Sequence, residues 1–183
     1  ATVVESDAGT ATAKFLISTR SKDRHGDVVE PMGCANRLER YKKNPVVFFG
    51  HKSYGLPVGS AFDKDGNFSV SVADDGVTSA VKFNLKTDES EQVFALVDAG
   101  ELRTASIGFI PLKAKIHKRK AEDEDEEKPR NEITFDPWMC FTFTEWELLE
   151  WSIVAVPANP DCVSLRLSKG IGGKALAPAV ARY

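Results

Sequence analysis

Apolar and polar residues alternate along much of this chain with the period of β-strands. In NFSVSVAD, Phe68, Val70 and Val72 fall on one face and Ser69 and Ser71 on the other, as in a half-buried strand. Other runs rich in apolar and β-branched residues predict further strands. These runs lie at 14–18, 27–30, 46–49, 77–85, 102–116 and 133–161. The last run is long enough for two strands or for one long, bent strand.

Two stretches have helical spacing instead. Residues 87–100 open with Thr87 or Asp88 as a cap and close on Gly100, which predicts a helix. Its predicted buried stripe consists of Val93, Leu96 and Val97. Residues 35–44 predict a short helix that stops before a proline. Six to eight strands, two or three helices and no regular βαβ alternation favour a mostly antiparallel sheet or barrel with helices packed outside.

Composition and charge divide the chain into one folded domain and three segments that we expect to be flexible. The 183 residues suit one domain. The net charge is −3, but six of the 27 acidic residues form one block at 122–127. Such a block cannot join a core, and we predict a flexible loop at 117–131. We also expect a flexible N-terminus at 1–12, a folded domain at 13–167 and a flexible tail at 168–183.

The remaining composition excludes several classes of function. Without the acidic block there are 24 basic and 21 (27 minus 6) acidic residues, well short of a nucleic-acid-binding stripe. No apolar run reaches the length of a membrane span, and the first ten residues lack a signal-peptide pattern. The three cysteines show no CxxC spacing, which indicates free thiols in a reducing compartment. We therefore expect a soluble protein that contacts neither membrane nor nucleic acid.

Three reactive side chains lie in strand contexts: His51, Ser106 and Glu150. Acyl transfer by a serine needs a neighbouring base, which an imidazole provides near neutral pH. An acidic group commonly orients that imidazole, and backbone N–H groups stabilise the oxyanion. Gly108, two residues after Ser106, would let backbone and substrate approach closely. These three residues form a chemically complete set, although spacing alone does not single them out among the many serines and carboxylates of the chain.

Each of these residues also has a simpler interpretation. Ser106 would then be a small polar residue on a strand face, and Glu150 would pair with a lysine or an arginine. Strict alternation places Glu150 and Ser152 on one face together with Leu148, and Trp151 on the other.

The segment DRHGD at 23–27 offers Asp23, His25 and Asp27 as possible metal ligands. A turn held by aspartate-to-backbone hydrogen bonds, with an exposed His25, is the favoured interpretation. The sequence has no HExxH or paired-histidine spacing that would support a metal site.

Four stretches together resemble a known family. They are DRHGDVVEPMG at 23–33, NPVVFFGHKSYGLPVGSA at 44–61, LVDAGELRTASIGFIP at 96–111 and ELLEWSIVAVPANPD at 147–161. In this order they are similar to the prohead, or procapsid maturation, serine proteases of tailed bacteriophages, a family that resembles the herpesvirus assemblins in fold. The similarity covers most of residues 18–165.

This resemblance implies an assemblin-like antiparallel β-barrel surrounded by helices. It also implies a serine endopeptidase that needs no cofactor and acts inside the assembling procapsid in the host cytoplasm. Its substrate would be the scaffolding protein or the scaffolding segment of the major capsid protein, and we expect it to form a homo-oligomer. The Gly- and Ala-rich tail at 168–183 is a candidate for self-cleavage.

By position, the family's nucleophile falls on Ser106, its histidine on His51 and its acidic group on Glu150. The assemblins use a second histidine as the third member. His117 is the one histidine after Ser106, and we rank it below Glu150. The backbone N–H of Ile107 is a candidate oxyanion donor.

Two alternatives remain at the level of sequence. One is a catalytically silent capsid or scaffold component with the same fold. The other is a metal-dependent hydrolase that uses His25, His51 and nearby aspartates.

Overall fold

The computed structural model describes residues 9–118 and 139–164. The acidic block at 122–127, the tail at 168–183 and the first eight residues lie outside this range. The flexibility predicted for these segments and the limits of the folded domain therefore stay predictions. Of the predicted N-terminal segment, the described part already enters the first strand at Thr12.

Strands dominate the described part of the chain, as the alternation predicts. They are β1 (Thr12–Thr19), β2 (Val28–Val29), β3 (Val46–Phe49), β4 (Gly59–Ser60), β5 (Ser71–Ala73), β6 (Gly76–Phe83), β7 (Thr104–Lys118) and β8 (Met139–Val154). The helices are the 3₁₀ helix η1 (Pro31–Cys34), α1 (Glu39–Lys43) and α2 (Asp88–Ala99). Within the described residues, no helix is long and apolar enough to cross a lipid bilayer.

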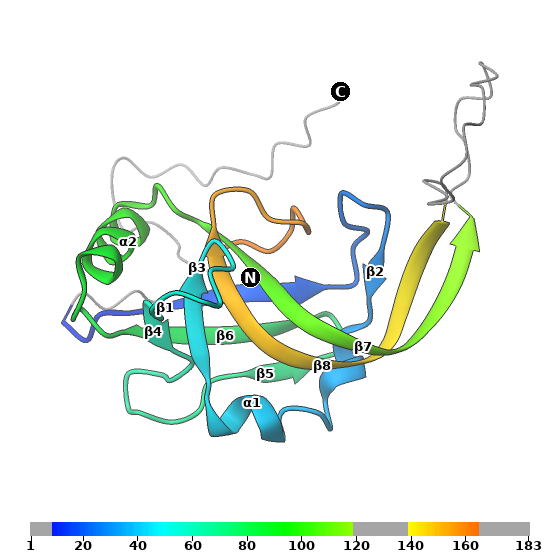
Figure 1. Cartoon of the computed structure of the whole chain (residues 1–183), viewed down its shortest axis with the longest axis horizontal. Helices are drawn as coiled ribbons and strands as arrows, with labels where there is room; N and C mark the ends of the chain where they lie inside the picture. The colour runs from blue at the N-terminus through cyan, green and yellow to red at the C-terminus, as the bar shows by residue number, and fades with distance from the viewer. Residues whose placement is uncertain (1–8, 119–138, 165–183) are drawn as a thin grey trace, which may run out of the picture.

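All eight strands belong to one strongly bent sheet. Its order is β1-β6-β4-β3-β8-β2, with β5 added to β6 and β7 added to β8. Most pairs are antiparallel, whereas β2 and β3 run parallel to β8. Figure 1 shows β7 and β8 as a long hairpin that curves across the other strands, with α2 at one end and α1 below β3.

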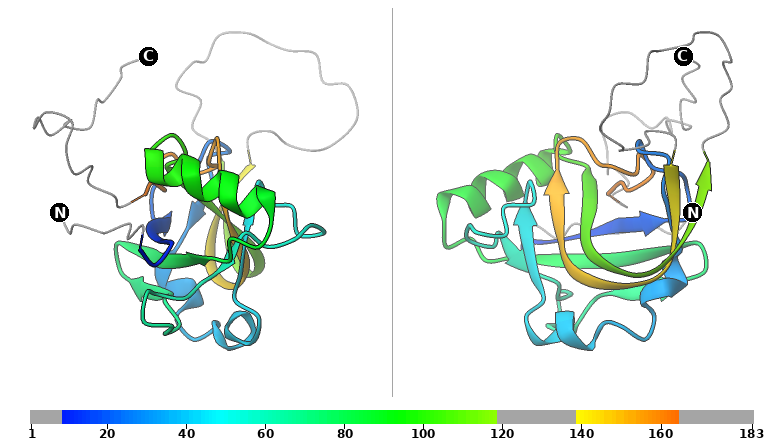
Figure 2. Two further views of the ribbon diagram at one scale, coloured as in Figure 1. Left: turned by 90° about the vertical axis from the view of Figure 1, so that its left-hand side faces the viewer. Right: turned by 45° about the vertical axis from the view of Figure 1, so that its right-hand side comes forward.

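A short segment after β8 nearly closes this sheet into a barrel. The N–H of Leu16 in β1 donates to the carbonyl of Val163 at 3.1 Å, and the N–H of Ala105 in β7 donates to the carbonyl of Cys162 at 3.0 Å. Residues 162–164 thus bridge β1 to β7, the two strands that would otherwise be separate edges. The curvature that brings them together is visible in Figure 2. The prediction of a mostly antiparallel barrel with few helices is confirmed.

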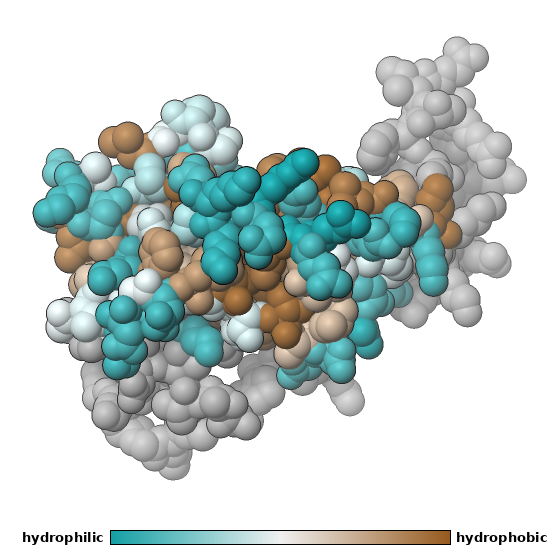
Figure 3. All heavy atoms as spheres, turned by 90° about the horizontal axis from the view of Figure 1, so that it is seen from below, coloured by the Kyte–Doolittle hydropathy of each residue, from teal (hydrophilic) through white to brown (hydrophobic). Residues whose placement is uncertain are grey.

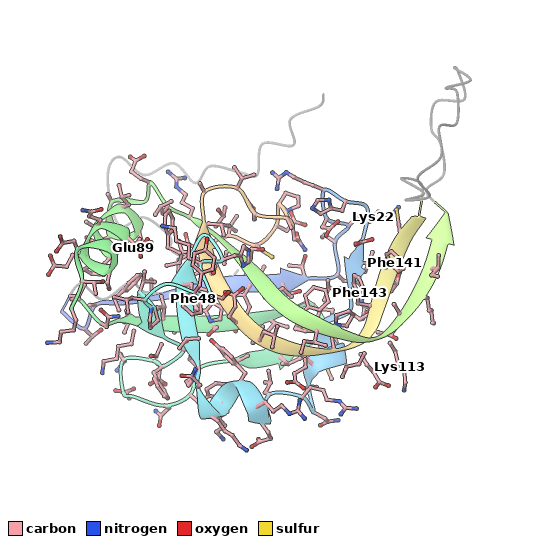
Figure 4. All side chains as sticks on the ribbon, in the orientation of Figure 1. Lys22, Phe48, Glu89, Lys113, Phe141 and Phe143 are labelled. Carbon is pink, nitrogen blue, oxygen red and sulfur yellow. The ribbon has the colours of Figure 1, made fainter. Side chains whose placement is uncertain are left out.

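The core fills the inside of the bent sheet. Its largest fully buried side chains are Trp146, Trp151, Phe15, Ile17, Leu148 and Ile153. The rings of Phe15 and Trp151 join β1 to β8 across a centroid distance of 5.5 Å. At the β2 end of β8, Phe141 and Phe143 stack at 5.7 Å (Figure 4). The two ends of β8 are thus packed by different aromatic clusters.

Two details of the predicted helices differ from the structure. The helix expected over 35–44 is limited to α1, because η1 and the turn after it occupy residues 31–36 and residues 37–38 are not helical. In α2 the buried residues are Ser90, Val93 and Val97, whereas Leu96 is 44% exposed. A stripe defined by positions 90, 93 and 97 leaves Leu96 on the side of the helix, so its predicted burial is wrong.

The outer surface is not uniformly polar. Ile110, Leu112 and Leu149 on β7 and β8 are 40%, 44% and 50% exposed. Figure 3 shows hydrophobic residues gathered between hydrophilic ones on the face seen from below. Exposed apolar groups of this kind are common at contact surfaces. The homo-oligomer expected from the sequence stays a prediction.

Candidate active site

The end of β3 turns His51 back toward β8. The N–H of Gly50 donates to the carbonyl of Ile153 at 2.9 Å, which holds the end of β3 beside β8. Gly50 and His51 then both adopt left-handed backbone conformations, with φ of 65° and 59°. Glycine tolerates this region, but for histidine it is strained by on the order of 1–3 kcal/mol. The backbone N–H of His51 is anchored by a 3.1 Å hydrogen bond to the hydroxyl of Ser152.

A β-bulge in β8 sets the direction of Glu150. Gly108 lies opposite Glu150 and Phe109 opposite Leu148, so Leu149 has no partner on β7. A bulge of this kind redirects the side chains that follow it. Leu148 is therefore 1% exposed in the core with Trp151. The prediction that Leu148 shares a face with Glu150 is wrong, because strict alternation ignores the extra residue.

The structure pairs two of the three predicted site residues directly. Nδ1 of His51 lies 2.7 Å from Oε1 of Glu150, and the hydroxyl of Ser152 donates to Oε2 of Glu150 at 2.7 Å. Glu150 is 8% exposed, and within the described residues its partners are these two groups rather than a lysine or an arginine. The charge of Glu150 also acts on Tyr41 in α1, where burial first and this charge second raise the pKa of the phenol.

Gly108 makes room for the carboxylate. A Cβ atom on residue 108 would lie 2.3 Å from Oε1 of Glu150 and 3.1 Å from its Cδ. The sequence suggested that this glycine allows a substrate to approach. In the structure, the space that a side chain would take is occupied by Glu150.

Ser106 lies on the neighbouring strand, on the same face as this pair. It is directly opposite Ser152 in the antiparallel register, and directly opposed residues project to one face with Cβ atoms about 5 Å apart. Ser106 is 8% exposed. Among residues 9–118 and 139–164, its hydroxyl forms no hydrogen bond with the His51 ring. The structure therefore brings Ser106 beside the His51–Glu150 pair without joining it to them.

The backbone direction of Ile107 follows from the same register. The N–H of Ala105 points away from β8, toward Cys162. Alternate residues of a strand direct their N–H groups to the same side, and the N–H of Ile107 accordingly also points away from β8. A small cavity of about 60 Å³ lies beside Ser106 and Ile107, with Ile17, Val29 and Phe109 among its apolar walls.

The other predicted candidates lie elsewhere. His117 is opposite Cys140 near the far end of the β7–β8 hairpin, on the order of 30 Å along the strand from Ser106. Asp23 accepts hydrogen bonds from the N–H groups of His25 and Asp27 at 2.8 and 2.9 Å. The prediction of an aspartate-held turn with an exposed His25 is thus confirmed. Within the described residues, no group of His, Cys, Asp and Glu side chains is arranged to hold a metal ion.

Cys34 and Cys162 do not supply a competing nucleophile. All three cysteines of the chain are free and buried. Free thiols are what their number and spacing in the sequence predict. Burial raises the pKa of the Cys34 and Cys162 thiols to about 12. These two thiols are therefore protonated near neutral pH, and a thiol is a poor nucleophile until it is ionised.

Sequence reasoning missed Ser152 as a member of this site. It was recognised only as a residue on the same face as Glu150. The available signal was the spacing of two in Glu-x-Ser, which places a hydroxyl next to the carboxylate on a strand. Its second contact, to the backbone of His51, depends on the parallel pairing of β3 and β8 and is not encoded locally.

Comparison with known proteins identifies related sequences. The sequence model of the Caudovirus prohead serine protease family matches residues 12–171. A prohead protease of Escherichia phage T5 is 30% identical over 171 residues, which make up 92% of this chain and 68% of that protein. No solved structure is significantly similar to the chain. The match spans both strands of the His51–Glu150 pair and the strand of Ser106, and the chain therefore belongs to the caudovirus prohead serine proteases.

Proposed function

We propose that Ser106, His51 and Glu150 form the catalytic triad of this serine protease. The observation that carries the proposal is the 2.7 Å contact between Nδ1 of His51 and Oε1 of Glu150. An acidic group at Nδ1 fixes the imidazole tautomer that leaves Nε2 free to act as a base. Ser106 projects from the adjacent strand on the same face, where a nucleophile is required.

In the proposed reaction, Nε2 of His51 takes the proton of the Ser106 hydroxyl while Oγ attacks the carbonyl carbon of the substrate. The imidazolium is stabilised by Glu150 and then protonates the leaving amine, which breaks the peptide bond and leaves an acyl-enzyme. Water, activated by the same imidazole, hydrolyses this ester. The N–H of Ile107 serves as an oxyanion donor, since it is not committed to β8.

The histidine must close on the serine for the first step. The side chain of His51 is 41% exposed, and the residues that follow it form a loop whose Tyr54 is 93% exposed. Catalytic hydrogen bonds are often long in free enzymes and shorten when substrate binds. A bound peptide that covers this loop would bring the imidazole onto Ser106.

The proposed substrate is the scaffolding protein, or the scaffolding segment of the major capsid protein, inside the assembling procapsid in the host cell. The prohead function of the family supports this assignment. The cavity beside Ser106 offers a position for a substrate side chain. We further propose that the enzyme is a homo-oligomer, that it needs no cofactor, and that it contacts neither nucleic acid nor membrane.

Cleavage of the scaffolding and major capsid proteins of the same phage tests this function. Wild-type protein should cut one of them, and Ser106→Ala and His51→Ala should abolish the cut. Glu150→Gln should lower kcat by roughly 10³- to 10⁴-fold, because an amide can donate to the ring and select the wrong tautomer. Cleavage by Ser106→Ala would refute the proposed triad. If the wild-type protein cleaved neither of them, the alternative of a catalytically silent capsid or scaffold component would be favoured.

Self-processing has a separate test. Mass spectrometry of the purified protein should show trimming within 168–183 in wild type and intact termini in Ser106→Ala. Identical termini in both proteins would contradict cleavage of the tail by the protein's own active site.

A further inference from the structure

Ser152 contacts two members of the proposed triad without being one of them. Its hydroxyl donates to Oε2 of Glu150 at 2.7 Å and accepts the backbone N–H of His51 at 3.1 Å. The residue is 0% exposed, so both contacts are shielded from water. We propose that Ser152 is a positioning residue of the protease, which orients the carboxylate and the histidine together; this inference rests on the proposed function.

The first contact fixes the plane of the carboxylate. A glutamate held through one oxygen can still rotate about its last side-chain bond, whose torsional preference is broad. In this site His51 occupies Oε1 and Ser152 occupies Oε2. Both partners donate, and each oxygen of the carboxylate therefore accepts one hydrogen bond. Oε1 is consequently held toward Nδ1, the geometry in which Glu150 can orient the ring.

The second contact holds the main chain that carries the ring. His51 has a φ of 59°, which is a strained conformation for a non-glycine residue and persists only when its surroundings support it. The acceptor on Ser152 provides such support from β8. One hydroxyl thus fixes His51 at two points, its backbone directly and its ring through Glu150.

Ser152 also leaves the nucleophile free. It lies directly opposite Ser106 in the β7–β8 register, and the two hydroxyls share one face. A serine has a single proton to donate, and Ser152 gives it to Glu150. Ser152 therefore does not donate to Ser106, and within the described residues no hydrogen bond joins the two hydroxyls. The Ser106 proton is thus not committed to Ser152 and is available for the imidazole.

Substitution of Ser152 tests this role. Ser152→Ala should lower kcat roughly 10- to 100-fold at nearly unchanged KM, because the peptide still binds while the base is misplaced. Ser152→Thr keeps the hydroxyl and should restore most of kcat. The matched control is Ser79→Ala, which removes another fully buried serine hydroxyl with hydrogen bonds of its own. That control should reduce stability and leave kcat unchanged.

A spectroscopic readout separates this inference from the proposed function. The Nδ1 proton of His51 should give a strongly downfield NMR resonance in wild type and in Ser106→Ala, and it should shift or broaden in Ser152→Ala. Wild-type kcat together with an unchanged resonance in Ser152→Ala would overturn the positioning role. Retained activity in Ser106→Ala would instead overturn the proposed triad, whatever the result at Ser152.

Discussion

At the scale of single residues, the site depends on where side chains are absent as much as on where they are present. The carboxylate of Glu150 lies over the backbone of Gly108, at a position where a Cβ atom would be 2.3 Å from Oε1. Hydrogen bonds from His51 and Ser152 hold the carboxylate at this position. Steric room and hydrogen bonding thus select the same position for the carboxylate.

Gly108→Ala should therefore displace Glu150 and lower kcat/KM by roughly 100-fold, the scale expected for a misplacement of about 1 Å. Peptide-cleavage kinetics measure the loss. Gly66→Ala is the control, because Gly66 has a φ of 85° but no atom within 4 Å of the added Cβ. That variant should be less stable yet fully active. Wild-type activity in Gly108→Ala would show that the carboxylate is not needed where the structure places it.

At the scale of elements, irregular features position the site. The bulge at Leu149 turns Glu150 out of the core, and the left-handed pair at the end of β3 turns His51 toward it. The loop after His51 is tied to the start of α2 by an ion pair between Lys52 and Glu89 at 2.7 Å. Because both side chains are well exposed, this pair contributes little to stability. Helix α2 thus borders the loop without dominating the energetics of the site.

The N-terminal cap of α2 gives a prediction at this scale. The Thr87 hydroxyl accepts the N–H of Ser90 at 3.2 Å. Thr87→Ala should lower the free energy of unfolding by about 1 kcal/mol, the usual cost of losing a cap, without changing kcat. Thr87→Ser keeps the acceptor and should lose less. Urea unfolding of the three proteins measures the difference, and equal stability of Thr87→Ala and wild type would contradict the assigned cap.

Some of these elements can be predicted from the local sequence and others cannot. Helix α2 was predictable because Thr87 and Gly100 mark its ends locally. The bulge at Leu149 was not, since it is defined by the pairing of β8 with β7 rather than by the sequence of β8. The proximity of His51 and Glu150, 99 residues apart, was expected through the family resemblance and not from spacing. Ser152 was missed because one of its two contacts comes from a parallel strand.

At the scale of the whole molecule, closure of the barrel buries the thiol of Cys162, and a second thiol, that of Cys34, is buried elsewhere in the fold. Residues 162–164 bridge β1 and β7, and Cys162 within this bridge is 1% exposed. Cys34 at the end of η1 is 0% exposed. Desolvation raises the pKa of both thiols from 9.0 to about 12. Neither closure by 162–164 nor its effect on Cys162 was predicted, because the hydrogen bonds that make the closure come from Leu16 and Ala105, which lie far away in the sequence.

Stability should consequently fall at alkaline pH. Below pH 9 both the folded and the unfolded state keep these thiol protons. The contribution of the buried thiols to the free energy of unfolding is then fully present. Between about pH 9 and 12 only the unfolded state releases them, and the free energy of unfolding should decrease by about 1 kcal/mol per pH unit for each thiol. Urea unfolding at several pH values measures this slope. Removing both thiols (Cys34→Ala, Cys162→Ala) should flatten the slope, and an identical slope would contradict the assignment to these groups.

The convergence of Ser106, His51 and Glu150 is tested most directly by reaction with a fluorophosphonate, followed by peptide mapping. The reagent should form one adduct, on Ser106, in wild type and in Ser79→Ala. His51→Ala should lose this adduct even though Ser106 is still present, because the hydroxyl then lacks its base. An adduct on a different serine, or undiminished labelling of Ser106 without His51, would contradict the triad.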